Sequence, residues 1–179
     1  MILGRGSILA LVALVWSLPL QVLAAPPPLQ SSLEYSVKAN YLVRFAAFVD
    51  WPAQSFAARN SPVVNCVVGR DPFNGALDRA ASGHTAHGRP LTVRRPRTAG
   101  AAAGCHILYV GRGGGGLAPG DHRAILEVTD AAVSSDRGMI HFVVSDDRVR
   151  FHIDLQAASR SRLSISSRLL NLALSVRGG

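Results

Sequence analysis

The chain has 179 residues, a formal net charge of +8 and a hydrophobic content of 48%. This length suits one domain that buries a substantial core without metals or many crosslinks. The positive charge comes from 18 Arg and one Lys, which are mostly scattered, so we expect a solvated basic surface and no nucleic-acid partner, with an acidic protein surface or anionic lipid headgroups as alternatives.

The first 24 residues have the order of parts of a secretory signal peptide. Arg5 supplies positive charge, an apolar run over residues 8–20 follows, and small residues come next at Ala24 and Ala25. The run is shorter than the roughly 20 apolar residues of a membrane-spanning helix, which leaves an uncleaved anchor as the alternative. We therefore predict a periplasmic protein with a signal peptide over 1–24, a Pro-rich linker over 25–32 and one domain over 33–177.

The first half of this domain alternates helices with short apolar strands. Residues 33–49 form a predicted helix, because Tyr41, Phe45 and Phe48 recur at helical spacing and Trp51-Pro52 ends the pattern. Residues 63–68 form a nearly continuous β-branched run, which is typical of a strand buried on both faces. The other expected elements are a helix over 73–82 capped by Asp71, strands over 91–93, 105–110 and 124–128, and a flexible glycine-rich connector over 111–120.

The second half predicts a hairpin and a closing helix. Strands over 139–144 and 149–155 flank a turn at 145–148, and in the second strand apolar residues alternate with Arg150, His152 and Asp154. A helix is expected over 161–176. The order of elements predicts the α/β class: a single domain with a mixed β-sheet flanked by helices on its faces. The outward row Arg150, His152 and Asp154 is a candidate partner-binding site, with a solvated strand face as the simpler alternative.

Two cysteines remain after the predicted signal peptide, Cys66 and Cys105. In an oxidising compartment an even number of cysteines predicts a disulfide, and two cysteines allow only one intramolecular pairing. Two separate buried thiols are the alternative, because cysteine is often buried without being crosslinked.

Signatures of catalysis or metal binding are not recognisable. Asp146 and Asp147 could serve acid–base chemistry, but their place in a predicted turn already explains them. His84 and His87 lie in a loop without the further ligands that a zinc site needs. The glycines of 111–116 lack the ending of a phosphate-binding loop, and no serine lies in a nucleophile elbow. We expect no enzyme activity, no cofactor and no metal.

Four segments of the sequence together resemble the YfiR-like family. Residues 38–52, which end in Val-Asp-Trp-Pro, resemble the opening helix of these proteins, and residues 66–73 resemble their first strand and turn. Residues 105–110 resemble their Cys-His-Ile-Leu strand, and the segments from Gly138 to Leu170 resemble their closing hairpin and helix. The resemblance covers nearly all of the predicted domain.

The resemblance implies an α/β fold, export and often a homodimer. It also implies a regulator that binds the periplasmic sensor domain of a membrane diguanylate cyclase, lowering cyclic-di-GMP output and biofilm formation. Cys66 and Cys105 match one family disulfide, but the second pair of some relatives is missing, which puts a redox switch in doubt. Alternatives are a small-ligand-binding module serving a sensor kinase or an outer-membrane receptor system, and an envelope hydrolase.

Overall fold

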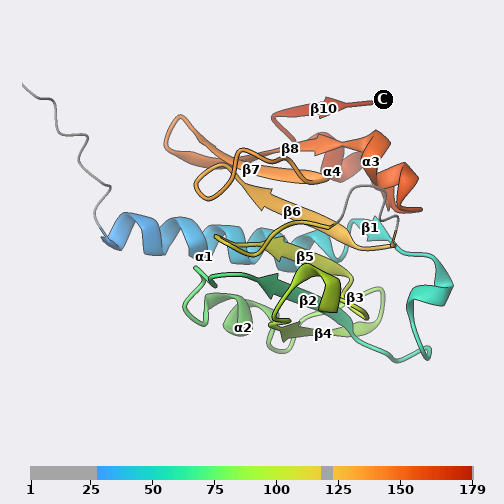
Figure 1. Cartoon of the computed structure of the whole chain (residues 1–179). Coiled ribbons are helices and arrows are strands. Elements are labelled where there is room, and N and C mark those ends of the chain that lie inside the picture. The colour runs from blue at the N-terminus through green and yellow to red at the C-terminus, as the bar shows by residue number, and fades with distance from the viewer. Residues whose placement is uncertain (1–27, 118–122, 179) are drawn as a thin grey trace, which may run out of the picture.

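The computed structural model describes residues 28–117 and 123–178, so the predicted signal peptide lies outside the described residues. The main sheet has eight strands, in the spatial order β10-β8-β7-β6-β5-β2-β4-β3 (Figure 1). Their bounds are β2 Val63–Val68, β3 Thr85–Ala86, β4 Arg89–Arg94, β5 Ile107–Val110, β6 Leu126–Asp130, β7 Ile140–Ser145, β8 Arg148–Asp154 and β10 Ser175–Arg177. The parallel strands β4, β2, β5, β6 and β7 adjoin the antiparallel strand β8, and β10 runs parallel to β8. The predicted fold class, a single mixed α/β domain, is confirmed.

Four α-helices and a short two-stranded ladder complete the described part. The helices are α1 Pro28–Phe45, α2 Ala76–Ala81, α3 Leu155–Arg160 and α4 Ser167–Leu170; two 3-10 turns are η1 Ala53–Ser55 and η2 Ala99–Ala101. The ladder joins β1 Val49–Asp50 to β9 Ser164–Ile165 in antiparallel register. Figure 1 shows α1 lying along the sheet, with its first residues beside the carboxyl ends of the parallel strands.

The boundaries of the opening helix differ from the prediction at both ends. α1 begins at Pro28, a residue suited to the first helical position, so residues 28–32 are helical where a linker was expected. It ends at Phe45 rather than at the predicted Val49, because the backbone nitrogens of Ala47 and Phe48 donate 3.0 Å hydrogen bonds to carbonyl oxygens three residues earlier and form a turn. The fully buried Val49 then pairs with Ile165 of β9. A tertiary strand contact thus overrides the helical pattern.

The predicted closing helix over 161–176 is wrong. The segment contains β9, the single turn α4 and the strand β10. Leu163 and Ile165 are buried while Arg162 and Ser164 are exposed, which is the two-residue alternation of a strand. Serine recurs throughout this segment, and its side chain competes with the backbone hydrogen bonds of a helix interior.

The glycine-rich segment after β5 packs closely against the sheet as far as Leu117, and is not simply the connector expected over 111–120. A Cβ atom on Gly111 would lie 2.2 Å from the carbonyl oxygen of Arg70, and one on Gly114 would lie 2.6 Å from that of Val68. Only glycine allows this approach of two backbones. Residues 118–120 of the predicted connector lie outside the described residues.

The start of the predicted second helix is also shifted. The carboxylate of Asp71 accepts a 2.8 Å hydrogen bond from the backbone nitrogen of Phe73, which makes a local turn. The helix itself begins later, at Ala76, with Gly75 as its N-cap. Asp71 therefore stabilises the turn that precedes α2 and does not cap the helix.

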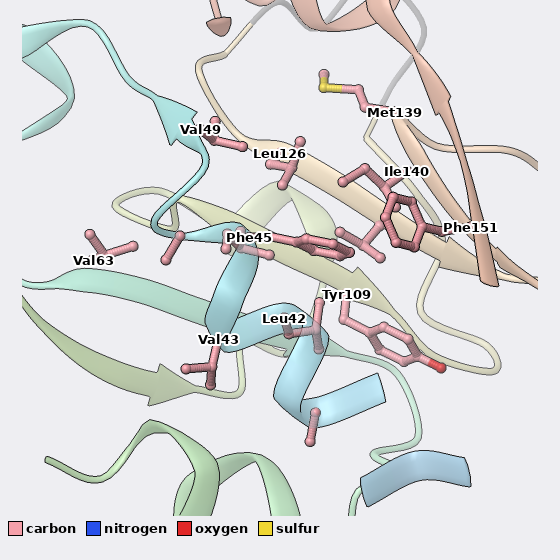
Figure 2. Packing of buried hydrophobic residues seen from close by; sticks show 14 of the residues in the cluster. Leu42, Val43, Phe45, Val49, Val63, Tyr109, Leu126, Met139, Ile140 and Phe151 are labelled. Atoms are coloured by element: carbon pink, nitrogen blue, oxygen red, sulfur yellow. The ribbon is translucent and has the colours of Figure 1, made fainter. Parts of the chain in front are cut away.

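Apolar side chains gather on both faces of the sheet. On one face α1 and α2 cover the larger cluster, in which Phe45 of α1 packs against Phe151 of β8 at a ring-centre distance of 5.3 Å (Figure 2). On the other face η2 and the glycine-rich segment cover a smaller cluster around the predicted disulfide. Cys66 and Cys105 form that disulfide, with their Cα atoms 5.8 Å apart.

Candidate functional site

A groove of about 680 Å³ lies between α1, the β7–β8 hairpin and the chain that follows α4. Its apolar lining comes from six side chains: Leu33, Val37, Tyr41, Val144, Val149 and Leu172. Its polar lining comes from Glu34, Asp147, Arg148, Arg150 and Asn171. The groove therefore offers an apolar base with charges of both signs around it.

Large aliphatic side chains in this groove are unusually exposed. Leu33 is 67% exposed, Val144 53% and Leu172 55%. Scattered exposed aliphatic residues are common on protein surfaces, but a contiguous group around a concave surface is typical of a binding site. Here three separate segments of the chain each contribute one such residue, so the group is a product of the fold.

The helix contributes a stripe of its own to the groove. Leu33, Val37 and Tyr41 recur every four residues, which places them along one side of α1. Another side of α1 is buried against the sheet and carries Ala39, Leu42, Phe45 and Ala46. Tyr41 lies between the two sides: its ring centre is 5.5 Å from that of Phe151, and the residue also lines the groove.

The hairpin contributes the facing wall. Val144 and Val149 are directly paired across β7 and β8, next to a two-residue turn of Asp146 and Asp147. Both aspartates have positive φ values, 51° and 55°, as a tight hairpin turn of this kind requires. The interpretation of these two carboxylates as turn residues is confirmed.

A buried ionic cluster fixes the first half of α1 on the sheet. The ammonium group of Lys38, which is fully buried, donates a 2.7 Å hydrogen bond to the carboxylate of Asp130 and a second one to that of Glu34. The Tyr109 hydroxyl donates to the same Asp130 oxygen at 3.0 Å. Burial raises the pKa of Tyr35 to about 12, helped by the charge of Asp130. The cluster holds the groove's helical wall in place, because Glu34 lines the groove itself.

The structure separates the three candidate residues of β8. Arg150 lines the groove. His152 and Asp154 lie instead in a small cavity on the other face of the sheet, where the Asp154 carboxylate pairs with Arg177 of β10. β10 pairs with β8 only at residues 152–154, so His152 and Asp154 are not at the edge of the sheet.

Sequence reasoning missed most of the groove. Leu33 and Val37 lie at the start of the predicted helix, where four-residue spacing of aliphatic side chains was a usable signal of a second apolar side. Leu172 was placed in a closing helix that does not exist. Only the fold could show that these residues converge.

The disulfide lies away from the groove, in the core of the opposite face. Cys66 is 1% exposed and Cys105 4% exposed. They join β2 to the segment before β5 across a sequence separation of 39. This placement makes the disulfide part of the scaffold and not of the groove's surface.

Neither a metal-binding group nor a membrane-spanning helix is found in the part of the chain that the structure describes. Within residues 28–117 and 123–178, no group of three or more His, Cys, Asp or Glu is arranged to hold a metal ion. No helix in the same ranges has both the length and the hydropathy to cross a membrane.

Comparison with known proteins assigns the family. A family model described as YfiR/HmsC-like matches residues 35–174, a range that includes most of the groove and both cysteines. No curated protein matches the chain. The family is regulatory and periplasmic and is not known for enzyme activity, and a disulfide fits that compartment. The chain therefore belongs to the YfiR/HmsC-like family, which at the family level implies a periplasmic regulator of a diguanylate cyclase.

Proposed function

We propose that this chain represses a membrane diguanylate cyclase by docking on the cyclase's periplasmic sensor domain through the groove. The observation that carries the proposal is the convergence of exposed Leu33, Val144 and Leu172 on one concave surface. Family membership supports a protein partner, and an exposed apolar group with a mixed-charge rim has the composition of a protein–protein interface. The occupant that we propose is an apolar segment of the sensor domain.

A groove of this kind can supply the binding free energy that repression requires. Turning a partner from about 99:1 active to 1:99 requires about 5.5 kcal/mol of differential affinity between its two conformations. Individual hot-spot side chains contribute about 2 kcal/mol or more when an interface buries them. Three of the six apolar side chains acting as hot spots would therefore be sufficient, provided that they contact only the inactive conformation of the cyclase.

The rim gives the docking its orientation. On the hairpin side Arg148 and Arg150 outnumber the single carboxylate of Asp147, whereas Glu34 lies on the helix side. Charges at the edge of an interface contribute more to specificity and to the rate of association than to affinity. We expect a sensor-domain segment with acidic residues toward the hairpin.

The proposal is tested by measuring cyclic-di-GMP in the organism whose genome encodes the chain. Deleting the gene should raise cyclic-di-GMP, and restoring the parent chain should lower it again. Val144→Asp, which places a carboxylate in the groove, should fail to lower it at equal protein level. Val176→Asp is the matched control, because Val176 is also exposed (39%) but lies on β10 outside the groove. Equal repression by both variants contradicts the proposal.

The groove also favours a second candidate function. Its volume of about 680 Å³ lies in the range of small-molecule sites, about 300–1,000 Å³. The chain would then be a ligand-binding module that serves a sensor kinase or an outer-membrane receptor system. A thermal-shift screen with metabolites separates the two functions, because a large shift that Val144→Asp abolishes, without any effect of the gene on cyclic-di-GMP, supports the second.

A homodimer is a further part of the proposal, on the strength of the family alone. Sedimentation equilibrium of the secreted chain would test it. A single species with twice the chain mass is expected, and a monomer at micromolar concentration contradicts it.

A further inference from the structure

A second, smaller cavity of about 130 Å³ lies on the face of the sheet opposite α1. Histidines from neighbouring strands, His141 of β7 and His152 of β8, line it together with Arg137, Ser175 and Arg177. This cavity is separate from the groove and plays no part in the proposed docking.

The two histidines lie directly opposite each other. His141 and His152 are partners in the antiparallel register of β7 and β8. Side chains at such positions leave their strands on the same face, with Cβ atoms about 4.5–5.5 Å apart. Two imidazole rings therefore share one small space, which is an unfavourable arrangement when both are protonated and nothing negative lies between them.

Hydroxyl groups hold one nitrogen of each ring. The Nδ1 atom of His141 lies 2.8 Å from the hydroxyl of Thr129, and that of His152 lies 2.6 Å from the hydroxyl of Ser175. The Thr129 oxygen already accepts a 2.8 Å hydrogen bond from the backbone nitrogen of Gly138. When a ring is protonated both of its nitrogens carry a hydrogen, so Nδ1 donates to the hydroxyl oxygen and Nε2 is a donor as well.

The charge around the rings is positive. Arg137 is exposed, and within the described residues no hydrogen bond or ion pair engages its guanidinium group. Burial lowers the pKa of both histidines, and the charge of Arg137 lowers each of them further. The one carboxylate of the lining, Asp154, is neutralised by Arg177 and accepts a 2.9 Å hydrogen bond from the backbone nitrogen of Ala157.

We propose that this cavity binds a small oxyanion, such as sulfate, phosphate or a carboxylate, between the His141 and His152 rings and the Arg137 guanidinium. The donors converge from three elements, the loop before β7, β7 itself and β8, and among the described residues of the lining the only carboxylate, that of Asp154, is paired with Arg177. A bound anion compensates the positive charge that the residues lining the cavity do not neutralise among themselves. The cavity's size limits the occupant to one anionic group and not a whole metabolite.

The binding depends on pH. The charged or titratable groups that face the rings are Arg137, Arg177, Asp154 and the two rings themselves, and Asp130 and Lys38 also act on His141 from the far side of the sheet. Histidine is the side chain whose ordinary pKa is close to neutrality, so the rings are the source of the pH dependence. Because a bound anion favours the protonated rings, it raises their pKa, and by linkage its affinity rises as the pH falls.

The test follows the ring protons of both histidines by NMR in the secreted chain, with sodium sulfate against sodium chloride at equal ionic strength. Sulfate keeps its double charge throughout, so any pH dependence belongs to the protein. We expect sulfate to raise the pKa of His141 and His152 together, and to bind at least about fivefold more tightly near pH 5.5 than near pH 7.5. A sulfate effect no larger than that of chloride overturns the proposal.

Two variants make the test specific. Arg137→Gln removes the unpaired guanidinium and should weaken sulfate binding about tenfold. Arg79→Gln is the control, since Arg79 is an exposed arginine of α2 that lines neither this cavity nor the groove; it should bind sulfate as the parent does. Equal weakening of sulfate binding by both variants would indicate a general effect of charge and would overturn the proposed site.

A last comparison distinguishes the source of the anion. Inorganic phosphate and glycerol phosphate offer the same anionic group, free or attached to a larger molecule. Tighter binding of inorganic phosphate supports a free ion as the occupant, and tighter binding of glycerol phosphate supports the end of a larger molecule. Failure of both to displace sulfate contradicts the proposal.

Discussion

The parallel and the antiparallel parts of the sheet differ in how completely they are covered. All six residues of β2 and all four of β5 are buried, whereas only Phe151 and Ile153 of the seven residues of β8 are buried. The central parallel strands β2 and β5 are covered on both faces, and the disulfide lies beside them. The antiparallel part has one covered face, and it contributes to both the groove and the small cavity.

This difference indicates that stability and recognition depend on different parts of the sheet. A parallel sheet is stable only when both of its faces are covered, so it leaves little surface for a partner. An antiparallel hairpin tolerates an open face, and its side chains are then available for binding. We therefore expect substitutions in the parallel part to change the free energy of unfolding, and substitutions in the antiparallel surface to change binding.

The largest effect on stability should come from the ionic cluster that ties α1 to β6. Lys38→Met leaves the buried carboxylate of Asp130 without its cation and should lower the free energy of unfolding by about 3–5 kcal/mol. The double variant Lys38→Met/Asp130→Asn removes both charges but keeps an acceptor for Tyr109, and should recover most of the loss. Urea unfolding of the three proteins measures this, and a double variant no more stable than the single one would show that charge is not the cause.

The disulfide should have the next largest effect. Replacing both cysteines by alanine removes a crosslink between residues 39 apart, which is worth about 2–4 kcal/mol through the entropy of the unfolded chain. Because the cysteines are buried away from the groove, cyclic-di-GMP should still fall when enough folded double variant is present. Loss of repression by a double variant that is still folded at 25 °C would mean that the disulfide acts directly in recognition.

A smaller effect of opposite sign is expected at the centre of the parallel part. Asn65 of β2 is 1% exposed, and neither amide atom of its side chain has a hydrogen-bond partner in the described structure. Asn65→Val removes two unsatisfied polar atoms and should raise the free energy of unfolding by about 1–2 kcal/mol. Thr92→Val on the neighbouring strand β4 is the control, since Thr92 is exposed and should change stability by less than about 0.5 kcal/mol. A lower free energy of unfolding for Asn65→Val would contradict this prediction and would mean that the amide makes a stabilising interaction.

His106 should make the stability of the parallel part depend on pH. Its Nδ1 atom accepts a 3.1 Å hydrogen bond from the backbone nitrogen of Val64, and its Nε2 atom lies 3.2 Å from the carbonyl oxygen of Ser55, so the neutral ring is satisfied on both sides. Burial lowers the pKa of His106 below its ordinary value, and Arg89 lowers it further.

The lowered pKa of His106 determines how the free energy of unfolding changes with pH. Above the ordinary pKa of about 6.5 the stabilisation is fully present, and it is lost as the pH falls below that value, because the unfolded chain binds the proton more readily. His106→Gln should therefore flatten the decline in unfolding free energy between about pH 7.5 and 5, leaving only what His141 and His152 contribute. An unchanged slope in the variant would contradict the buried neutral ring.

How well the sequence predicts a segment depends on how clear its local pattern is, and not on which part of the sheet it joins. The β-branched run 63–68 and the alternation after Val149 each have a single pattern; β2 has the predicted bounds, and β8 is shifted from its predicted bounds by one residue. The segment after Ser161 has no single pattern: leucines at helical spacing lie among serines, and only the pairing of Ile165 with Val49 decides for a strand. Cys66 and Cys105 could be paired from their number alone, because only one intramolecular bridge is possible.

The candidate site was the least predictable feature. Arg150, His152 and Asp154 share a strand face in the sequence, but the sheet's surroundings place them at two different sites. The buried pair Lys38–Asp130 joins residues 92 apart, and no local pattern signals such a contact. Groove and cavity alike depend on long-range packing, which periodicity does not encode.

The most direct test of the central claim is the affinity of the chain for the periplasmic domain of the proposed cyclase partner, measured by titration calorimetry with three proteins. The groove account predicts that Val144→Asp weakens the parent affinity at least about tenfold, or about 1.4 kcal/mol. Val176→Asp, on the exposed strand β10, should bind within about twofold of the parent. Val144→Asp binding as tightly as the parent, with an unchanged melting temperature, would contradict docking through the groove.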